Sequence, residues 1–218
     1  KWFYFLAGMA ISVKYFFFIP YVAIILLLEK MARLILASSS PRRRELLLQL
    51  GLQFEVFSPE IDENILEGEL ASEYVARLAQ AKAQAVLRRF PDATVIAADT
   101  SLSVDDEIIG KPESKAHAFS IWQKLSGRCH DVLTGVCVAN AEQILYQVVQ
   151  TQVEFQPLTP NDMENYWATG EPVGKAGAYA IQGQAAQYIP RIVGSYTNVV
   201  GLPLHETIKL LKAVNASN

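Results

Sequence analysis

From Arg33 onward, short apolar segments of strand length alternate with amphipathic segments of helix length, and this alternation most constrains the fold. The pattern predicts strands at residues 34–37, 53–57, 94–98, 130–139, 143–155 and 196–200. It predicts helices at residues 41–50, 72–89, 114–125, 159–168 and 203–214. Residues 102–104 and 108–109 flank Asp105-Asp106 and are typical of a hairpin. Strands that alternate with helices, without an internal repeat, favour one α/β domain.

The composition of the 218 residues supports a folded domain, because 51% of them are hydrophobic and 19% are charged. The net charge is −3, of which the first 30 residues carry +2, so the rest of the chain carries −5. The net negative charge of residues 31–218 argues against nucleic acid as a partner, because nucleic-acid binding requires a basic face. Cys129 and Cys137 fall on one expected strand and cannot readily pair, so we expect two reduced, buried thiols, as in cytosolic proteins.

Residues 1–30 are set apart by an apolar run, Trp2 to Leu28, broken by one serine, one lysine and one proline. A membrane anchor, a signal peptide and a translation artefact each fit such a run. No small-x-small cleavage site follows it, and an anchor would leave almost no linker before the first core strand. Because Met31-Ala32 resembles an ordinary start, we interpret residues 1–30 as a leader outside the working protein and residues 31–218 as the functional domain. Membrane association is expected only if the leader is a true anchor.

The segment LILASSSPRRRELLLQLG, residues 34–51, crowds three serines and three arginines around the start of a predicted helix. A helix N-terminus presents free N–H groups and partial positive charge, so it attracts anions. Arg42 and Arg43 in the first turn are unfavourable for an isolated helix, and a bound anion would offset that cost. Together with the hydroxyls of Ser38 and Ser40, they suit a polyphosphate. The alternative is that Ser40 only caps the helix and the arginines are solvated.

A second group of polar residues follows the apolar strand at 94–98. Asp99 and Thr100 are expected at its carboxyl end, where open α/β sheets place ligand-binding residues. A carboxylate at such a position can act as a general base or a metal ligand. Asp62-Glu63 would add acids for a hard cation, and Lys111 an ammonium group for phosphate. The alternative is that Asp99 only caps a turn.

Seven segments in order resemble the Maf family of nucleoside triphosphate pyrophosphatases: LASSSPRRRELL, EIDE, YVARLAQAKA, AADTSLSVDDEIIGKP, LSGRCHDVLTGV, GEPVGKAGAYAIQG and GSYTNVVGLPL. The resemblance covers residues 34–211 and does not extend to residues 1–30. It implies a single bilobed α/β domain with an elongated mixed β-sheet, flanking helices and a central cleft, similar to the inosine triphosphate pyrophosphatases. Members of the family use a divalent metal, Mg²⁺ or Mn²⁺, to hydrolyse nucleoside triphosphates to the monophosphate and pyrophosphate.

The resemblance also implies roles for individual residues. Asp99 would accept a proton from water, and Asp99 and Glu63 would hold the metal. The phosphates would be surrounded by Ser38, Ser40, Arg43, Lys82 and Lys111. The substrate would be selected by Arg42, Thr100 and Gln182, which are similar to the branch that acts on dTTP and UTP. The amide of Gln182 suits the O4 and N3 edge of a pyrimidine, although it could instead brace the glycine-rich segment around it.

The resulting hypothesis is a cytoplasmic enzyme that hydrolyses dTTP, UTP and modified pyrimidine analogues, with a link to cell-division arrest. One alternative is the same chemistry on modified purine nucleotides such as 7-methyl-GTP or ITP. Another is a regulatory protein that only senses nucleotides. Ala180 stands where the family generally has glycine, which bears on specificity rather than on chemistry. The resemblance is also compatible with a homodimer.

Other polar and aromatic residues are expected to be structural. His130 lies in a β-like stretch with no cysteine or histidine at metal-ligand spacing, so we expect a strand histidine. Tyr166 and Tyr179 are expected in the core or the cleft wall. Thr134 and Lys175 are interpreted as supporting residues.

Overall fold

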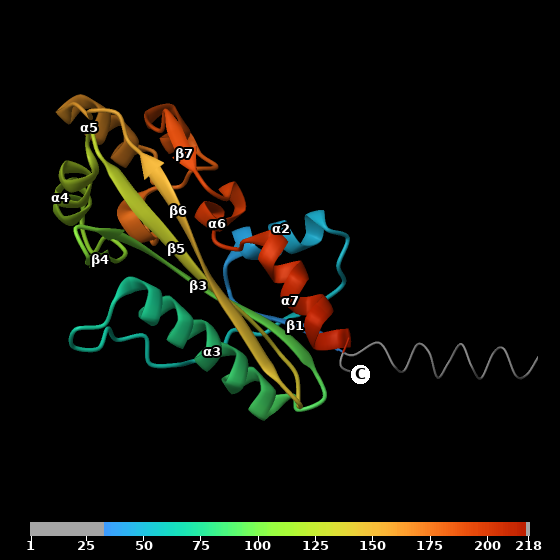
Figure 1. The fold of residues 1–218 in the computed structure, drawn as a ribbon. Coiled ribbons are helices and arrows are strands. Elements are labelled where there is room, and N and C mark those ends of the chain that lie inside the picture. Colours follow the sequence, from blue (N-terminus) through green and yellow to red (C-terminus); the bar gives the residue numbers. More distant parts are fainter. Residues whose placement is uncertain (1–32, 217–218) are drawn as a thin grey trace, which may run out of the picture. The chain divides into compact units, whose positions relative to one another are not determined.

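A mixed β-sheet of seven strands organises the part of the chain that the structure describes, residues 33–216 (Figure 1). The structure is a computed structural model. All but the first of these residues belong to one compact unit, Leu34–Asn218. The mixed sheet with its helices confirms the predicted α/β class. The predicted leader, residues 1–30, lies outside the described residues.

The elements follow one another in an irregular α/β order. The strands are β1 (Leu34–Ala37), β2 (Glu55–Val56), β3 (Thr94–Val104), β4 (Glu107–Ile109), β5 (Cys129–Ala139), β6 (Ile144–Glu154) and β7 (Arg191–Val193). The helices are α2 (Pro41–Gln49), α3 (Ala71–Arg89), α4 (Lys115–Leu125), α5 (Pro160–Ala168), α6 (Tyr196–Val200) and α7 (Leu204–Ala216), with 3₁₀ turns η1 (Ala176–Ala178) and η2 (Gln184–Tyr188). The strand order is β2-β1-β3-β5-β6-β7, with β4 beside β3. Strand β1 runs parallel to both its neighbours, and the remaining pairs are antiparallel.

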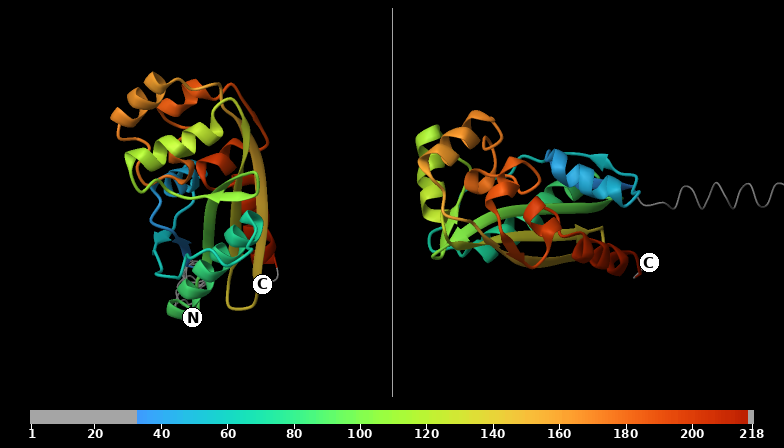
Figure 2. Two further views of the ribbon diagram at one scale, coloured as in Figure 1. Left: turned by 90° about the vertical axis from the view of Figure 1, so that its left-hand side faces the viewer. Right: turned by 90° about the horizontal axis from the view of Figure 1, so that it is seen from above.

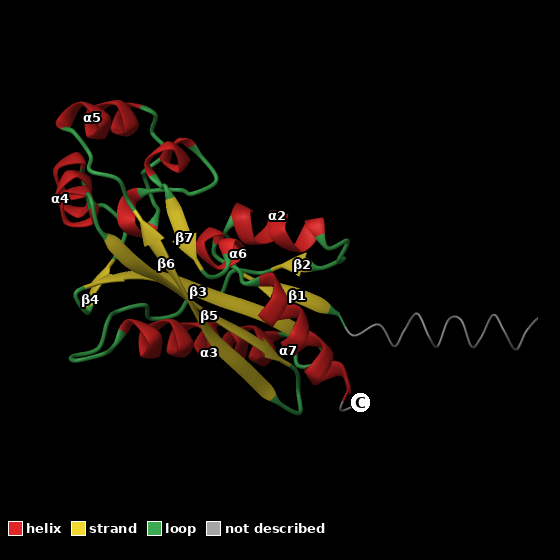
Figure 3. Cartoon of the chain, turned by 45° about the horizontal axis from the view of Figure 1, so that its top comes forward, coloured by secondary structure: helices red, strands yellow, loops and turns green. Residues whose placement is uncertain are grey.

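Alternate residues of the central strands build two separate apolar layers, because successive side chains of a strand point to opposite faces. On one face, Val95 and Cys137 pack with Ala79 and Val86 of α3. On the other face, Ile96 belongs to the larger cluster that includes side chains of α2, α4, α5 and α7. Figure 3 shows α3 below the sheet, with α2 and α6 above it. Both faces of the first half of β3 are therefore covered, which explains the apolar run from Val95 to Ala98.

One edge of β3 is left open between two partner strands. Strand β1 pairs with β3 only as far as Ala37 opposite Ala97, and β4 pairs with it only from Leu102 onward. The opposite edge of β3 is paired with β5 along its length, from Val95 to Ser103. The interrupted edge therefore exposes the middle of β3, which carries Asp99 and Thr100. Figure 2 shows α4 and α5 toward one end of the sheet and α2 and α7 toward the other.

A glycine lets α3 approach the sheet beside this open edge. Gly135 of β5 pairs with Asp99, and a Cβ atom at position 135 would lie 2.2 Å from the backbone oxygen of Val75 in α3. No side chain can be accommodated at that distance, so glycine is required for the close packing. The contact brings the buried face of α3, which carries Lys82, toward the carboxylate of Asp99.

The structure corrects the expected end of the central strand. Residues 94–98 were expected to form a strand with Asp99 and Thr100 after its end, but β3 continues without interruption to Val104. The sequence from Ala98 to Val104 contains no glycine or proline, and pairing with β5 holds it extended. Asp99 and Thr100 therefore lie inside the strand, and the gap between β1 and β4 gives them access to the cavity described below.

The structure also shows that the strand predicted at residues 196–200 is wrong. This segment is the short helix α6, whose N-cap Ser195 accepts a hydrogen bond from the backbone N–H of Asn198. Gly201 ends it with a φ of 121°. The β-branched residues suggested a strand, but the cap and the terminal glycine favour a helical turn. The short strand β7 just before it was not predicted.

Two further expectations concern cysteines and membranes. Cys129 and Cys137 are both free thiols on β5, which confirms that they do not pair. Cys137 is buried as expected, but the expectation of burial is wrong for Cys129, which is exposed at the start of the strand. Among residues 33–216, no helix combines the length and the apolar character needed to cross a membrane.

His130 is a buried strand residue, as expected. Its Nε2 lies 2.8 Å from the hydroxyl of Tyr179, and its ring packs edge-on against Phe155. Burial lowers its pKa to about 4. Because an unfolded histidine binds its proton near pH 6.5, the unfolded chain takes up a proton before the folded one does. The contribution of His130 to stability is therefore full above pH 6.5 and falls as the pH drops toward 4.

We expect this histidine to cost the protein about 2 kcal/mol of unfolding free energy between pH 7 and pH 5. Urea unfolding at the two pH values measures the loss. The variant His130→Gln removes the titrating group. Between pH 7 and pH 5 its unfolding free energy is therefore expected to fall by about 2 kcal/mol less than that of the wild type. Equal losses in both proteins would contradict a neutral, buried His130.

Candidate active site

A cavity of about 450 Å³ opens at the interrupted edge of β3. It is bounded by the β1–α2 turn, by α3, by the end of α6 and by the glycine-rich segment 174–182. All of the site residues predicted from the sequence line it: Ser38, Ser40, Arg42, Arg43, Glu63, Lys82, Asp99, Thr100, Lys111 and Gln182. The fold thus brings together residues from distant parts of the chain: Ser38 and Gln182 are 144 positions apart in the sequence.

The β1–α2 turn presents a helix N-terminus to this cavity. Ser40 is the N-cap of α2, and its hydroxyl accepts a hydrogen bond from the N–H of Arg43 at 3.5 Å. Pro41 occupies the first turn, which contains no acidic residue. The hydroxyl of Ser38 accepts the N–H of Ser40 at 3.2 Å. The positive end of α2 is therefore exposed to the cavity without a carboxylate to neutralise it.

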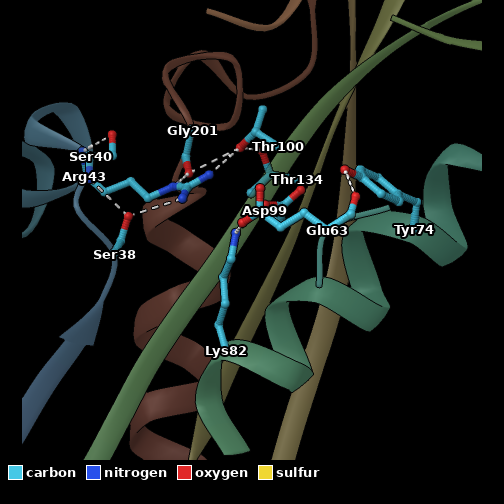
Figure 4. A network of polar contacts seen from close by, with 10 residues as sticks. All are labelled: Ser38, Ser40, Arg43, Glu63, Tyr74, Lys82, Asp99, Thr100, Thr134 and Gly201. Carbon is cyan, nitrogen blue, oxygen red and sulfur yellow. Dashed lines mark hydrogen bonds and ion pairs between the residues drawn. The ribbon is translucent and has the colours of Figure 1, made fainter. Parts of the chain in front are cut away.

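Arg43 is held by the protein on three sides (Figure 4). Its Nε donates to the backbone oxygen of Gly201 at 2.7 Å. Its Nη1 donates to Ser38 at 3.2 Å, and its Nη2 donates to Thr100 at 3.0 Å. Burial lowers the pKa of Arg43, against the attraction of Asp99. Arg43 therefore ties the β1–α2 turn, β3 and the end of α6 together, in addition to placing positive charge at the cavity wall.

Thr100 and Thr134 form a buried chain of hydroxyl groups behind Arg43. Their Oγ1 atoms lie 2.9 Å apart, and Thr134, which is fully buried, donates to the backbone oxygen of Asn198 at 3.1 Å. Thr134 is thus a supporting residue in the structure, as interpreted from the sequence. The hydroxyl of Thr100 is committed to protein partners and fixes the position of the Arg43 guanidinium.

Two carboxylates converge on Lys82 of α3 (Figure 4). The Nζ of Lys82 lies 2.6 Å from Asp99 Oδ1 and 2.8 Å from Glu63 Oε1. Lys82 and Asp99 are buried, whereas the side chain of Glu63 is 48% exposed. Burial would raise the pKa of Glu63, but its hydrogen bond and attraction to Lys82, with the charges of Lys111 and Arg43, lower it overall. Glu63 is therefore ionised at neutral pH.

Tyr74 of α3 holds the loop that carries Glu63. Its hydroxyl donates to the backbone oxygen of Glu63 at 3.0 Å. Burial and the nearby carboxylates of Asp99 and Glu63 raise the pKa of Tyr74 to about 12, so it stays a hydrogen-bond donor at neutral pH. This positioning contact was not predicted, because residues 11 apart in sequence on a loop and a helix give no local signal.

The residues around Lys82 fit a divalent cation. Hard cations prefer carboxylate oxygens, and Mg²⁺ commonly uses one or two carboxylates together with phosphate oxygens and water. Asp99 and Glu63 supply two such carboxylates, and both lie within 2.8 Å of the Nζ of Lys82. No group of three or more acidic, histidine or cysteine side chains suited to a metal occurs among residues 33–216. The protein can therefore provide part of a coordination sphere, which leaves room for ligands from a bound phosphate.

Further cations line the other side of the cavity. Burial lowers the pKa of Arg42, and burial together with repulsion from Arg42 lowers the pKa of Lys175. Lys111 is exposed at the cavity and close enough to influence Glu63. Lys175 was interpreted as a support, but the structure places it in the cavity wall. The sequence signal that could have indicated this position is the glycine-rich segment in which Lys175 lies.

Gln182 reaches the cavity from the turn that ends this segment. It is exposed, and its amide makes no hydrogen bond within the described chain. Tyr179 also lines the cavity, but it is buried and its hydroxyl is engaged with His130. Gln182 therefore offers a free donor and acceptor, whereas Tyr179 forms part of the wall.

A comparison with protein families matches residues 33–214 to the model described as "Maf-like protein". The chain belongs to the Maf family. The resemblance inferred from seven sequence segments is thereby confirmed, over nearly the same residues. This Maf chain is 66% identical over 183 residues to a "dTTP/UTP pyrophosphatase" of Acinetobacter baylyi, a match that covers 84% of this chain and 100% of the relative.

Other relatives of this Maf chain carry the same name. A "dTTP/UTP pyrophosphatase" of Symbiobacterium thermophilum is 50% identical over 181 residues, which cover 83% of this chain and 93% of the relative. Among solved structures, the Ham1 protein of Staphylococcus aureus matches with a TM-score of 0.47 and 15% identity, over 85% of this chain and 98% of the other.

Proposed function

We propose that this Maf protein hydrolyses dTTP and UTP to the nucleoside monophosphate and pyrophosphate. The observation that carries the proposal is the meeting of a cation-lined helix N-terminus with an acidic pair, Asp99 and Glu63, in one cavity. A relative 66% identical over its whole length is named for this activity. The charge pattern and the name of the relative support the same class of reaction.

The triphosphate binds where positive charge gathers. The N-terminus of α2 offers backbone N–H groups, and Ser38 and Ser40 add hydroxyls. Arg42 and Lys111 make no side-chain hydrogen bond or ion pair within residues 33–216, so they remain available for phosphate oxygens. Lys175 adds a third cation at the cavity wall, although its ammonium group also donates to the backbone oxygen of Glu171. Arg43 contributes charge from a fixed position, because protein acceptors already hold its guanidinium.

Asp99 acts as the base that takes a proton from the attacking water. Its Oδ1 is held by Lys82, while its Oδ2 makes no hydrogen bond to residues 33–216 and can accept the proton. As the water oxygen bonds to phosphorus, the anhydride P–O bond breaks and pyrophosphate leaves with the bonding electrons. Lys82 keeps the carboxylate aligned, and the cations stabilise the charge that spreads over the phosphoryl oxygens.

Asp99 and Glu63 are the residues proposed to hold Mg²⁺ or Mn²⁺. A bound divalent cation would neutralise charge on the phosphate oxygens and the leaving pyrophosphate. Tyr74 supports this site by fixing the backbone at Glu63. Lys82 balances the two carboxylates in the absence of the metal.

Base selection is proposed to rest on Gln182 and Arg42, with Thr100 acting through Arg43. The amide of Gln182 can donate to O4 and accept from N3–H of thymine or uracil. Arg42 borders the cavity beside Lys175, on the side of the glycine-rich segment. The hydroxyl of Thr100 is not free to bind a base, because its Oγ1 is hydrogen-bonded to Arg43 and Thr134. The expected cytoplasmic location and the homodimer remain predictions.

A panel of four nucleotides tests the proposed base preference. Pyrophosphate release from dTTP and UTP is expected to exceed release from 7-methyl-GTP and ITP by about 100-fold in kcat/KM, because the two-ring bases must fit a site proposed for one ring. Both purines present O6 beside N1–H, as the pyrimidines present O4 beside N3–H, so the expected discrimination comes from the size of the base and not from this edge. Initial rates at equal Mn²⁺ concentration give the comparison. A preference for either purine would contradict the assignment to dTTP and UTP. Nucleotide binding without any turnover would favour a sensing protein instead.

A further inference from the structure

Glu171 lies outside the cavity, in the loop after α5, yet its carboxylate contacts the turn that carries Gln182. Its Oε2 accepts the backbone N–H of Gln184 at 2.9 Å, and its Oε1 accepts the N–H of Ala185 at 3.4 Å. Burial would raise the pKa of Glu171, but the hydrogen bonds from Tyr166 and from these two N–H groups lower it overall. The carboxylate is therefore ionised and holds the C-terminal side of the turn.

The N-terminal side of the same turn is held by Tyr166 of α5. The Tyr166 hydroxyl accepts the backbone N–H of Ala180 at 3.1 Å and donates to Glu171 Oε1 at 2.6 Å. The tyrosine ring is 4% exposed and packs against Trp122 with a centroid distance of 5.3 Å. A ring fixed in the core thus orients both the carboxylate and the backbone at Ala180.

The carboxylate lies directly against the backbone of the turn. A Cβ atom at Gly183 would be 2.0 Å from Glu171 Oε2, so glycine is needed for this approach. The turn itself is closed by the N–H of Gly183 donating to the oxygen of Ala180 at 3.0 Å. Gln182 is the exposed residue between these two anchored positions, and its own side chain makes no hydrogen bond within residues 33–216 that would fix it.

We infer that Glu171 and Tyr166 are positioning residues for base recognition, which they serve by holding the turn that presents Gln182. The inference rests on the proposed function, in which the Gln182 amide recognises the pyrimidine edge. The backbone oxygen of Glu171 also accepts a hydrogen bond from the ammonium group of Lys175. One acidic residue thereby connects the recognition turn with a cation of the cavity wall. We call the contacts of Glu171 and Tyr166 with this turn the clamp. The Asp99 carboxylate and its partners belong to other elements, so the chemical step does not depend on the clamp.

The test compares kcat/KM for dTTP with that for dCTP, whose amino group replaces O4 as a donor. In Glu171→Gln the dTTP preference is expected to fall about tenfold, which corresponds to the loss of about one hydrogen bond. The fall should appear in KM, with kcat for dTTP within about twofold of the wild type. Gln182→Ala should lose the preference to a similar extent, and the double variant should lose little more because both act on one contact.

Matched variants separate the clamp from general effects. Glu164→Gln removes an exposed carboxylate of α5 that pairs with Lys115, and it should leave the preference unchanged. Tyr166→Phe keeps the core ring and removes the hydroxyl, so it should lower the preference in the same direction even if Glu171→Gln folds poorly. A wild-type preference in both Glu171→Gln and Tyr166→Phe, with a loss in Gln182→Ala, would overturn the inference. No loss in Gln182→Ala would overturn it as well, because the turn would then present no recognition group.

A measurement without substrate distinguishes this inference from the proposed function. Amide hydrogen exchange at Ala180 and Gln184 should become about tenfold faster in Glu171→Gln than in Glu164→Gln. Unchanged protection would contradict the clamp, whatever the substrate. Faster exchange in an enzyme that releases no pyrophosphate from dTTP would instead contradict the proposed function and leave the clamp established as a structural feature.

Discussion

Replacing Asp99 by asparagine is expected to lower kcat for dTTP by about 10³-fold, because the amide keeps the shape of the side chain but cannot accept a proton from water. The side chain lies in the middle of β3, opposite Gly135, so the substitution should preserve the strand pairing. Pyrophosphate release at saturating dTTP and Mn²⁺ measures the loss. A KM close to that of the wild type would place the effect in the chemical step.

Asp92→Asn provides the control for this prediction. Asp92 is exposed in the turn that leads into β3, so the same chemical change there should leave the rate unaffected. Thermal unfolding of both variants excludes a general loss of structure. Undiminished turnover in Asp99→Asn would show that another group accepts the proton, and Glu63 would be the next candidate.

Replacing Lys82 by methionine is expected to lower kcat/KM for dTTP by about 100-fold, since the ammonium group aligns Asp99 and supplies positive charge at the phosphate site. It should also reduce the unfolding free energy of the metal-free protein by about 2 kcal/mol, because two carboxylates lose the cation between them. That figure is below the usual cost for a fully buried pair because the Glu63 side chain is 48% exposed. Initial rates and urea unfolding check the two effects.

Added Mn²⁺ should stabilise Lys82→Met more than the wild type, because a divalent cation can replace the missing positive charge between Asp99 and Glu63. Thermal unfolding with and without the metal gives this comparison without any substrate. Lys124→Met is the matched control: Lys124 pairs with Glu107 at 2.7 Å on the surface, where an ion pair contributes little. Equal metal effects in Lys82→Met and the wild type would contradict a metal site at these carboxylates.

Local sequence signals were sufficient for much of the fold. Ser40 followed by Pro41 indicated the start of α2, and Thr159 followed by Pro160 indicated the start of α5, because caps and N1 prolines act within a few residues. The true length of β3 could not be predicted in this way. Its pairing with β5 involves residues 28 to 44 positions away, and this pairing keeps residues after Ala98 extended.

The predicted site residues all line one cavity, but their contacts depend on tertiary structure. The sequence placed Arg43 among the phosphate ligands, whereas only the fold reveals that Gly201, Ser38 and Thr100 hold its guanidinium. The positioning role inferred for Glu171 had no sequence signal, because its partners are backbone N–H groups on a different loop. Close approaches such as that of α3 to Gly135 depend on packing between distant elements and likewise escape local patterns.

The products formed from dTTP test the central claim most directly. Incubation of the purified protein with dTTP and Mn²⁺, followed by separation of the nucleotides and assay of the phosphate products, is expected to give dTMP and pyrophosphate in equal amounts. Formation of dTDP and inorganic phosphate would contradict the account, because cleavage would then fall on the other anhydride bond. Intact dTTP after prolonged incubation of the folded protein would contradict it as well.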